Sequence, residues 1–210
     1  GFIGGDAGSV KVAERCLWDE DEHVAEIARL VLERMPGRFA YNAVMATIGK
    51  ADEEPRADLL FTLAKGGDHG AVMTLVIFSG SDHDGVRLSA LEGLARLAAP
   101  EAVEVLLAVA GKSDDPLSRR IFQEELRLAD GLAAAGNVKD SRRLYEFALK
   151  NAPEDFQRAR ALHQLCPLGD EGAVPVLLQG LADGAERVRS LAMRRLSALD
   201  GPGVTTALLK

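Results

Sequence analysis

Aromatic residues are scarce in this chain. They make up 5% of its 210 residues, with one Trp and two Tyr, whereas apolar residues as a whole make up 47%. Most of the apolar residues are Leu, Ala and Val. These residues suit closely packed helices better than a sandwich of strands, which is rich in aromatic and β-branched side chains. The composition therefore favours an all-α core.

Cysteine is also rare, and long apolar runs are missing. Cys16 and Cys166 are the only two cysteines, and neither belongs to a CxxC or Cys/His metal pattern. No apolar stretch reaches the length of a membrane-spanning helix, so we expect no membrane insertion. The sequence has no nucleophile elbow, P-loop or dinucleotide fingerprint either, and we expect no cofactor.

Positive charge is in deficit, because the net charge is −7. General nucleic-acid binding needs Lys and Arg to neutralise phosphates, and the acidity argues against it. An acidic binding surface is one explanation of this charge. The one we favour is local, since carboxylates cap free N–H groups and suit the positive end of the helix dipole. Many of the acids fall at expected helix starts, namely 19–22, 52–54, Asp82, Asp84, Asp114, Asp115, Glu154, Asp155, Asp183 and Glu186.

The chain repeats itself. Residues 86–107 align without a gap to residues 157–178 and share ten positions, and residues 5–24 align to residues 169–188 and share nine. Equivalent helix-start positions at 24, 55, 86, 157 and 188 are separated by 31, 31, 71 and 31 residues. A step of 71 corresponds to two repeats with extra residues. Such a period is typical of a repeat array and takes precedence over any local motif.

Each repeat is expected to be a helical hairpin. The first helix carries apolar residues about four apart, as in Val188, Ala192 and Leu196, and the second helix does the same, as in Val174 and Leu178. Gly and Pro mark the short turns, so the helices must pack antiparallel. Residues 73–78, MTLVIF, are rich in strand formers, but they occupy the second-helix frame and we expect them to be helical.

The 31-residue pairs resemble HEAT-like repeats, in particular the short bacterial variety first noted in phycobilisome lyase-type proteins. The residues that carry the resemblance are the acid–x–Val–Arg helix starts at 84–87 and 186–189 and the second-helix text AVPVLL at 173–178. The resemblance implies an all-α right-handed solenoid of about six antiparallel helix pairs, each stabilised by its neighbours. Such repeats serve many roles, so the resemblance does not name a function.

The middle unit, residues 114–151, differs from the others. Residues 128–155 fit the tetratricopeptide frame, with its key positions at Leu128, Ala129, Leu132, Ser141, Tyr145, Ala148 and Pro153. Residues 117–136 imply a first helix about two turns longer than its neighbours. The opening residues 1–4 look like the tail of a helix, and residues 208–210 fall inside a helix pattern. We expect residues 1–210 to be a single repeat array from a longer protein, with residues 114–151 as a longer tetratricopeptide-like unit.

Arginine recurs near the first-helix starts, at Arg56, Arg87, Arg158 and Arg189, each three residues after an acid, at Glu53, Asp84, Asp155 and Glu186. One hypothesis is a ladder of arginines that grips an acidic ligand. The alternative, which we favour because the frame is fixed, is a polar seam that closes repeat ends and links neighbours through charge-assisted hydrogen bonds.

Histidine does not indicate a metal site. His69 is expected in a turn within a pair and His83 in a turn between pairs, which places them about 16 Å apart across a helix of 11 residues. His23 and His163 belong to other repeats. Two enzymes of similar architecture can be tested against the sequence: deoxyhypusine hydroxylase holds iron with His-Glu pairs, which this chain lacks, and HEAT-like DNA glycosylases need a basic, aromatic groove.

The remaining candidate is a surface for a protein or peptide. In HEAT-like solenoids the second helices line the concave side, and the outward positions of these helices are candidates for partner contact: Lys11, Arg15, Asn42, Met73, Ile77, Phe78, Glu104, Arg142, Glu146 and Gln179. Most are polar and mixed in sign. Met73, Ile77 and Phe78 are the apolar exception and suggest a contact; alternatively, a neighbouring repeat covers them or the outward face is displaced by one residue.

Together these features predict a non-catalytic scaffold that binds protein or peptide along its concave face or spaces other modules of the parent chain. A chromophore-lyase-like or chaperone-like accessory protein is the alternative from another class. A nucleic-acid-binding HEAT-like protein is a third, and the acidity disfavours it.

Overall fold

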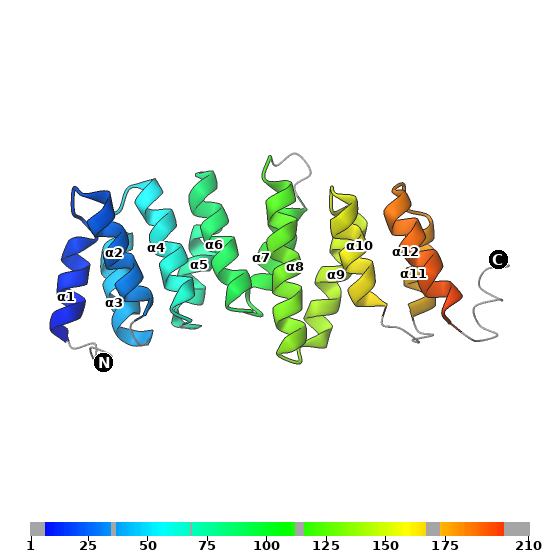
Figure 1. Cartoon of the computed structure of the whole chain (residues 1–210), viewed down its shortest axis with the longest axis horizontal. Coiled ribbons are helices and arrows are strands. Elements are labelled where there is room, and N and C mark those ends of the chain that lie inside the picture. Colours follow the sequence, from blue (N-terminus) through cyan, green and yellow to red (C-terminus); the bar gives the residue numbers. More distant parts are fainter. Residues whose placement is uncertain (1–6, 35–36, 68, 112–115, 167–172, 200–210) are drawn as a thin grey trace. The chain divides into compact units, whose positions relative to one another are not determined.

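The described part of the chain is helical throughout. The computed structural model describes residues 7–34, 37–67, 69–111, 116–166 and 173–199, and no strand occurs in these ranges. The all-α fold predicted from the sequence is confirmed (Figure 1). The elements are α1 (Ala7–Cys16), α2 (Glu22–Glu33), α3 (Gly37–Ile48), α4 (Glu53–Lys65), η1 (His69–Ala71), α5 (Val72–Phe78), α6 (Asp84–Arg96), α7 (Ala102–Ala110), α8 (Ser118–Ala134), α9 (Val138–Asn151), α10 (Asp155–Leu165), α11 (Val174–Leu181) and α12 (Glu186–Ser197).

The helix starts follow the repeat period. Helices α2, α4 and α6 begin at residues 22, 53 and 84, which are 31 residues apart, and α10 and α12 begin at 155 and 186, again 31 apart. Helix α8 begins at residue 118, so the step of 71 residues divides into 34 and 37. The extra residues of the middle unit therefore lie both before and after the start of α8.

Acidic residues do mark helix starts, although fewer of them act as caps than predicted. Asp21 is the N-cap of α2, and its carboxylate accepts a hydrogen bond of 2.9 Å from the His23 N–H. Asp52 and Glu154 hold the extended cap conformation of α4 and α10 without a side-chain bond. Acids also fill the first turns of α4, α6, α10 and α12, where they favour the helix dipole.

Three helix ends carry a left-handed residue, and one of them is Gly67 after α4, with φ +71°. At the end of α8, Gly136 has φ +83° and the Asn137 N–H bonds the Leu132 carbonyl at 2.8 Å, which satisfies one of the open carbonyls of the last turn. At the end of α6, Ala98 takes the same role with φ 48°. The turn into α9 then places Asn137 as its N-cap, accepting from the Asp140 N–H.

Some boundaries differ from the prediction. Residues 73–78 are helical, as expected, within α5. Helix α8 has 17 residues, against 11 to 13 in α2, α4, α6, α10 and α12. The excess is therefore between one and two turns, because the turn at Pro116 and Leu117 delays the helix start. The expectations for residues 1–4, Asp114, Asp115 and 208–210 lie outside the described residues.

The chain divides into two compact units, residues 1–105 and 106–210. In the first unit, first helices pack on first helices, α2 on α4 and α4 on α6, while α1, α3 and α5 pack on the following first helix. Figure 1 shows α2, α4 and α6 as successive rods. Leu32, Leu60, Leu91 and Leu94 along these rods are fully buried.

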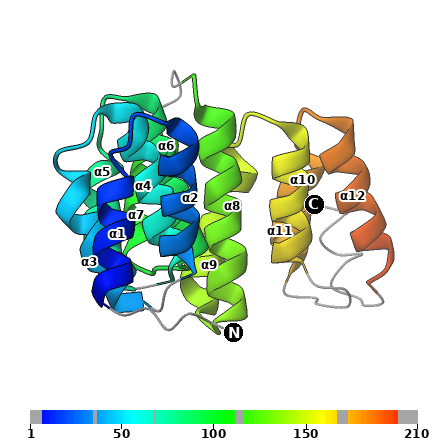
Figure 2. The ribbon, with the colours of Figure 1, turned by 60° about the vertical axis from the view of Figure 1, so that its left-hand side comes forward.

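The second unit follows the same rule. Helix α8 packs on α9, α9 on α10, and α10, α11 and α12 pack on one another, as both views show (Figures 1 and 2). Six of the seven tetratricopeptide positions are buried, and Pro153 is exposed; the buried ones are Leu128, Ala129, Leu132, Ser141, Tyr145 and Ala148. The hairpin that this resemblance implies is therefore present as α8 and α9.

Small residues allow three helices to meet. A Cβ atom added at Gly93 of α6 would lie 2.9 Å from the Ala64 Cβ atom of α4 and 2.9 Å from the Leu75 Cδ2 atom of α5. At Gly180 of α11, an added Cβ atom would lie 2.8 Å from the Leu162 Cδ2 atom of α10 and 3.1 Å from the Ala192 Cβ atom of α12. In both places a first helix, its second helix and the next first helix share one contact point.

We expect Gly93→Val to lower the free energy of unfolding by about 1–3 kcal/mol, because the added methyl groups overpack a junction of three helices. Gly49→Val is the matched control, since a Cβ atom there meets nothing within 4 Å. Chemical denaturation followed by circular dichroism measures both. Equal stability of the two variants would contradict the tight junction.

Candidate functional site

The candidate contact residues predicted from the sequence are distributed over the second helices, with one to three residues on each. Nine of the ten are exposed: Lys11, Arg15, Asn42, Met73, Ile77, Glu104, Arg142, Glu146 and Gln179. The structure brings three of them together on α5 and two on α9, where the Arg142 Nε atom lies 3.0 Å from the Glu146 carboxylate. Their role in binding a partner stays a prediction.

Helix α5 carries two of the three most exposed large apolar side chains among the described residues, the third being Val138 of α9. Met73 is 65% exposed and Ile77 is 70% exposed, and they stand one turn apart on the same face. Val72 and Leu75 point inward and are buried. Neither a neighbouring repeat nor a shift of the face by one residue therefore accounts for the pattern MTLVIF.

Phe78 departs from the prediction. Its ring is half-buried, and the Arg56 guanidinium lies 5.7 Å from the ring centroid. A cation over an aromatic face is a stabilising contact that covers the ring. Phe78 therefore forms the edge of the exposed pair, and Met73 and Ile77 form the α5 patch.

The recurring arginines form a polar seam at the ends of the second helices. Arg56 donates to the carbonyls of Ile48 and Ala51, at 3.3 Å and 2.5 Å. Arg158 donates to the carbonyls of Ala152 and Pro153, and Arg189 to those of Asp183 and Gly184. Each guanidinium thus satisfies carbonyls in the connection that follows the preceding helix, and Arg56 also bonds the last residue of α3.

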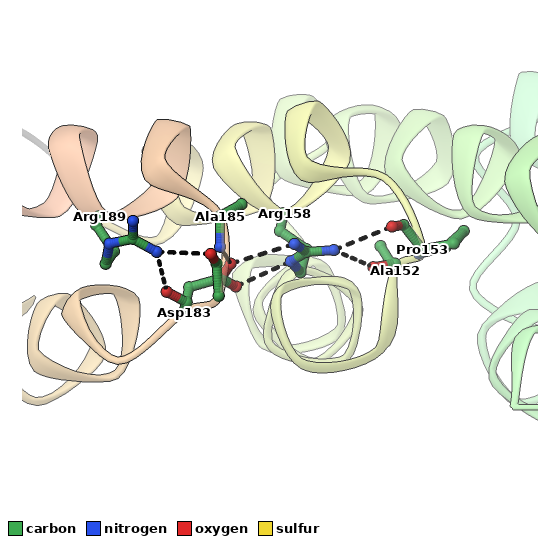
Figure 3. A network of polar contacts seen from close by, with 7 residues as sticks. Ala152, Pro153, Arg158, Asp183, Ala185 and Arg189 are labelled. Atoms are coloured by element: carbon green, nitrogen blue, oxygen red, sulfur yellow. Dashed lines mark hydrogen bonds and ion pairs between the residues drawn. The ribbon is translucent and has the colours of Figure 1, made fainter.

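Arg158 also links two repeats (Figure 3). Its Nε and Nη2 atoms donate to the two carboxylate oxygens of Asp183, at 2.9 Å and 3.2 Å. Such a bidentate pair has fixed geometry and is stronger than a single neutral hydrogen bond. With its guanidinium occupied on both sides, Arg158 has the structural role that the fixed frame predicted.

The acids three residues before these arginines have different partners. Arg87 bonds its own acid, Asp84, at 2.9 Å. Two of the other acids reach across to the next repeat: Glu53 lies 3.4 Å from His83, and Asp155 lies 3.8 Å from Arg187. Because first helices stand side by side, a residue one period away is as close as a residue one turn away.

Asp183 holds the centre of the seam as an anion. Burial opposes its ionisation, but the hydrogen bonds from Arg158 and from the Ala185 N–H, together with the charges of Arg158 and Arg189, hold the pKa of Asp183 below its ordinary value of 3.8. The stabilising contribution of this carboxylate is present above pH 3.8 and is lost as the pH falls through the lower folded-state pKa.

A second polar cluster surrounds Asp130, and the repeat pattern did not predict it. The Asp130 carboxylate accepts hydrogen bonds from the Tyr145 hydroxyl, from Arg160, and from the Gln164 amide at 3.2 Å. These residues come from α8, α9 and α10, and Asp130, Tyr145 and Gln164 line a pocket of about 280 Å³ together with Ser141. Burial and the Asp130 charge raise the pKa of Tyr145, so its hydroxyl remains a donor.

Glu125 is a further surprise inside α8. It is fully buried, and neither carboxylate oxygen has a hydrogen-bond partner. Burial raises its pKa from 4.5 to about 9, so the carboxyl is neutral at pH 7. The sequence does indicate this burial, because the helical spacing places Glu125 on the same face as the buried residues Ile121 and Leu128.

The histidines lie apart. His23 is 3.8 Å from Glu26, His83 contacts Glu53, and the His163 Nδ1 atom is 2.6 Å from Arg195. His69 is exposed in η1. Within the described residues no three His, Cys, Asp or Glu side chains cluster as a metal site would require, and none of these helices is long and apolar enough to cross a membrane.

Comparison with known proteins identifies the class of helical-repeat fold. Residues 41–127 match the family of HEAT repeats. No curated protein matches the sequence. Solved structures do: human deoxyhypusine hydroxylase, in complex with glycerol, superposes with a TM-score of 0.53 at 19% identity over 96% of this chain and 88% of that one.

Two other structures superpose equally well. The complex of CpcE and CpcF of phycocyanin lyase from Nostoc sp. PCC7120 has a TM-score of 0.53 at 18% identity, over 99% of this chain and 83% of that one. An engineered protein has a TM-score of 0.53 at 19% identity, over 94% and 97%. Identities this low show a shared fold. The chain therefore has a HEAT-like helical-repeat fold, as the sequence resemblance implied.

We expect Arg158→Ala to lower the free energy of unfolding by about 2–3 kcal/mol at pH 7, because it leaves Asp183 and two carbonyls without their donor. Arg142→Ala, which removes an exposed pair, should cost less than about 0.5 kcal/mol. Urea denaturation measures both. The cost of Arg158→Ala should shrink as the pH falls below 3.8, where Asp183 begins to be protonated in the unfolded chain.

We expect Glu125→Gln to flatten the dependence of stability on pH. The folded state keeps a proton that the unfolded chain releases above pH 4.5, so stability falls between pH 4.5 and about 9. The slope is up to about 1.4 kcal/mol per pH unit. Thermal unfolding from pH 5 to 9 measures it. Glu146→Gln, an exposed control, should leave the slope unchanged, and an unchanged slope in Glu125→Gln would exclude a buried neutral acid.

Proposed function

We propose that this chain is a non-catalytic scaffold that binds a protein or peptide partner through the outward faces of its second helices. The observation that carries the proposal is the α5 patch, where Met73 and Ile77 are 65% and 70% exposed on one helix face. Exposed apolar side chains of this size are stabilising only when a partner removes them from water.

The surroundings of the patch support a specific contact. Thr74, on the inner side of α5, donates to the Met45 sulfur atom of α3 at 3.5 Å, and Arg56 covers Phe78. The helix that carries Met73 and Ile77 is therefore held on both sides, so binding requires little ordering of the protein itself. Methionine adapts its shape to different partners, whereas isoleucine provides a rigid anchor.

The polar second-helix residues complete the proposed surface within each unit. Asn42 on α3 and Glu104 on α7 are exposed in the first unit, and Gln179 on α11 is exposed in the second. Polar rims around an apolar centre are typical of transient protein interfaces. Other modules of a parent chain are partners of the same kind and would use the same surface.

The fold likeness to deoxyhypusine hydroxylase and to phycocyanin lyase does not transfer an activity. The proposal of a non-catalytic role rests on the contacts of the polar groups: the arginines of the seam bond carbonyls and carboxylates, and Asp130 bonds Tyr145, Arg160 and Gln164. Stoichiometric uptake of a bilin pigment, detected by its absorption spectrum, would instead favour the lyase-like alternative.

We expect a photo-crosslinking residue at position 77 to capture a partner. The affinity of the purified partner for the purified chain is then measured. Ile77→Glu should weaken the affinity of that partner at least tenfold, because it places a charge in a desolvated contact. Met193→Glu, which places the same charge on an exposed apolar position of the first helix α12, is the matched control for nonspecific loss. Isothermal titration calorimetry measures both, and an unchanged Kd in Ile77→Glu would remove the α5 patch from the interface.

A further inference from the structure

The second unit has a basic groove between two of its first helices. The groove has a volume of about 300 Å³ and lies between α10 and α12, which pack side by side (Figures 1 and 2). Each helix contributes one stripe, because the lining residues are three or four positions apart. The principal lining residues are Phe156, Arg160 and His163 of α10 and Arg187, Leu191 and Arg194 of α12. Among the described residues no carboxylate belongs to this wall.

The packing of first helices does not require these cations. Helices α4 and α6 are the equivalent pair in the first unit, and counting from the helix starts places Asp58 at the position of Arg160 and Glu92 at that of Arg194. Helices α4 and α6 together carry five acids and four Lys or Arg, whereas α10 and α12 carry two acids and six arginines. In a chain with a net charge of −7, the positive charge of α10 and α12 is therefore a departure from the repeat that the fold does not explain.

Contacts across the groove hold its two walls together. At the helix starts Arg187 lies 3.8 Å from Asp155, and at the other end an Arg195 Nη2 atom lies 2.6 Å from the His163 Nδ1 atom. A guanidinium only donates hydrogen bonds, so in this geometry Nδ1 accepts and the Nε2 atom of His163 carries the ring proton. The groove is therefore held at both ends before any ligand binds.

The arginines keep donors for a ligand. Arg194 is exposed, and within the described part of the chain its guanidinium has no hydrogen-bond or ion-pair partner. Arg160 bonds Asp130 through its Nη2 atom, and the exposed pair of Arg187 with Asp155 contributes little energy. Because a guanidinium has five N–H donors in a planar fork that matches a carboxylate, each of these arginines can bind a carboxylate of a ligand.

An apolar floor accompanies the cations. Phe156 is 39% exposed, and the Arg119 guanidinium lies 5.6 Å from its ring centroid, while Leu191 is half-buried on the facing helix. The α10 stripe from Phe156 to His163 spans about 10 Å along the helix axis, at 1.5 Å for each residue. About three residues of an extended peptide cover this length. A short segment with carboxylates around one apolar side chain therefore matches the groove in length and in chemistry.

Acids at the helix starts favour a peptide over a nucleic acid. Glu154, Asp155 and Glu186 stand at the starts of α10 and α12, beside the end of the groove that Phe156 and Arg187 form. A continuous phosphate backbone that followed the groove would pass these carboxylates and be repelled, whereas a short peptide ends before them. The net charge of −7 acts in the same direction.

We propose that the groove between α10 and α12 binds a short acidic segment of a partner protein. Its Asp or Glu carboxylates contact Arg160, Arg187 and Arg194, and an apolar side chain among them lies on Phe156 and Leu191. This surface belongs to the second unit and shares no residue with the α5 patch of the first.

The test uses a fluorescein-labelled peptide with one leucine flanked on each side by three glutamates, and fluorescence anisotropy measures its Kd for the full chain. Arg187→Glu and Arg194→Glu should each raise the Kd at least roughly tenfold, because each reverses a charge that faces the carboxylates. Arg187 lies in the first turn of α12, where an acid suits the helix dipole, so this variant keeps its fold even if Arg194→Glu is less stable. Circular dichroism establishes the fold of both.

Matched controls separate the groove from the net charge of the chain. Arg120→Glu makes the same charge change at an exposed arginine of α8 and should leave the Kd unchanged within about twofold. The probe with glycine in place of leucine should bind more weakly, because it leaves the apolar floor uncovered. Binding should also weaken as the NaCl concentration rises, since salt screens exposed charges.

Three results would overturn the proposal. The first is no binding of the probe at millimolar concentration and low salt, or an equal loss in Arg120→Glu and Arg194→Glu. The second is a single-stranded oligonucleotide of equal charge that binds more tightly than the probe and depends on the same arginines. The third is a probe that binds only after Asp170→Asn, Glu171→Gln and Asp200→Asn, which would assign the groove to acids that follow α10 and α12 in this chain.

The two proposed surfaces can fail independently. Ile77→Glu, which changes the α5 patch, should leave the Kd of the acidic probe unchanged. Arg187→Glu should in turn leave the Kd of a partner captured at position 77 unchanged, if that partner contacts the α5 patch alone.

Discussion

Burial of each helix against the next copy of itself is the interaction on which the rest of this structure depends. A single hairpin with helices of 7 to 17 residues has no closed core, and each buried leucine contributes about 1.5–3 kcal/mol only when a neighbour covers it. At Gly93 and Gly180 three helices approach so closely that no side chain fits. The repeat period is therefore a packing constraint, since a helix of different phase would place a large residue at these points.

The polar contacts follow from the same geometry. Because first helices stand side by side, ion pairs join residues about one period apart, as Arg29 to Asp58 and Glu33 to Lys65 do. The arginines of the seam add a second function, since each bonds carbonyls of the connection that leads into its own helix. A surface that looked like a ladder for an acidic ligand is in this way largely used to join one repeat to the next.

The candidate functional features lie where residues depart from the repeat pattern. Met73 and Ile77 are apolar on a face where the equivalent positions of other second helices carry polar residues. This feature concerns a surface and not a catalytic group. Glu125 is another irregularity, but its burial makes it a determinant of stability.

The sequence by itself determined the helical class, the 31-residue period, the helical state of residues 73–78 and the exposure of Met73 and Ile77, because all of these depend on local periodicity and on copies in phase. Only the tertiary structure decided which partner each charge takes. Asp130 bonds residues 15, 30 and 34 positions away along the chain. Such contacts depend on how neighbouring helices are placed side by side, which a pattern along one helix does not record.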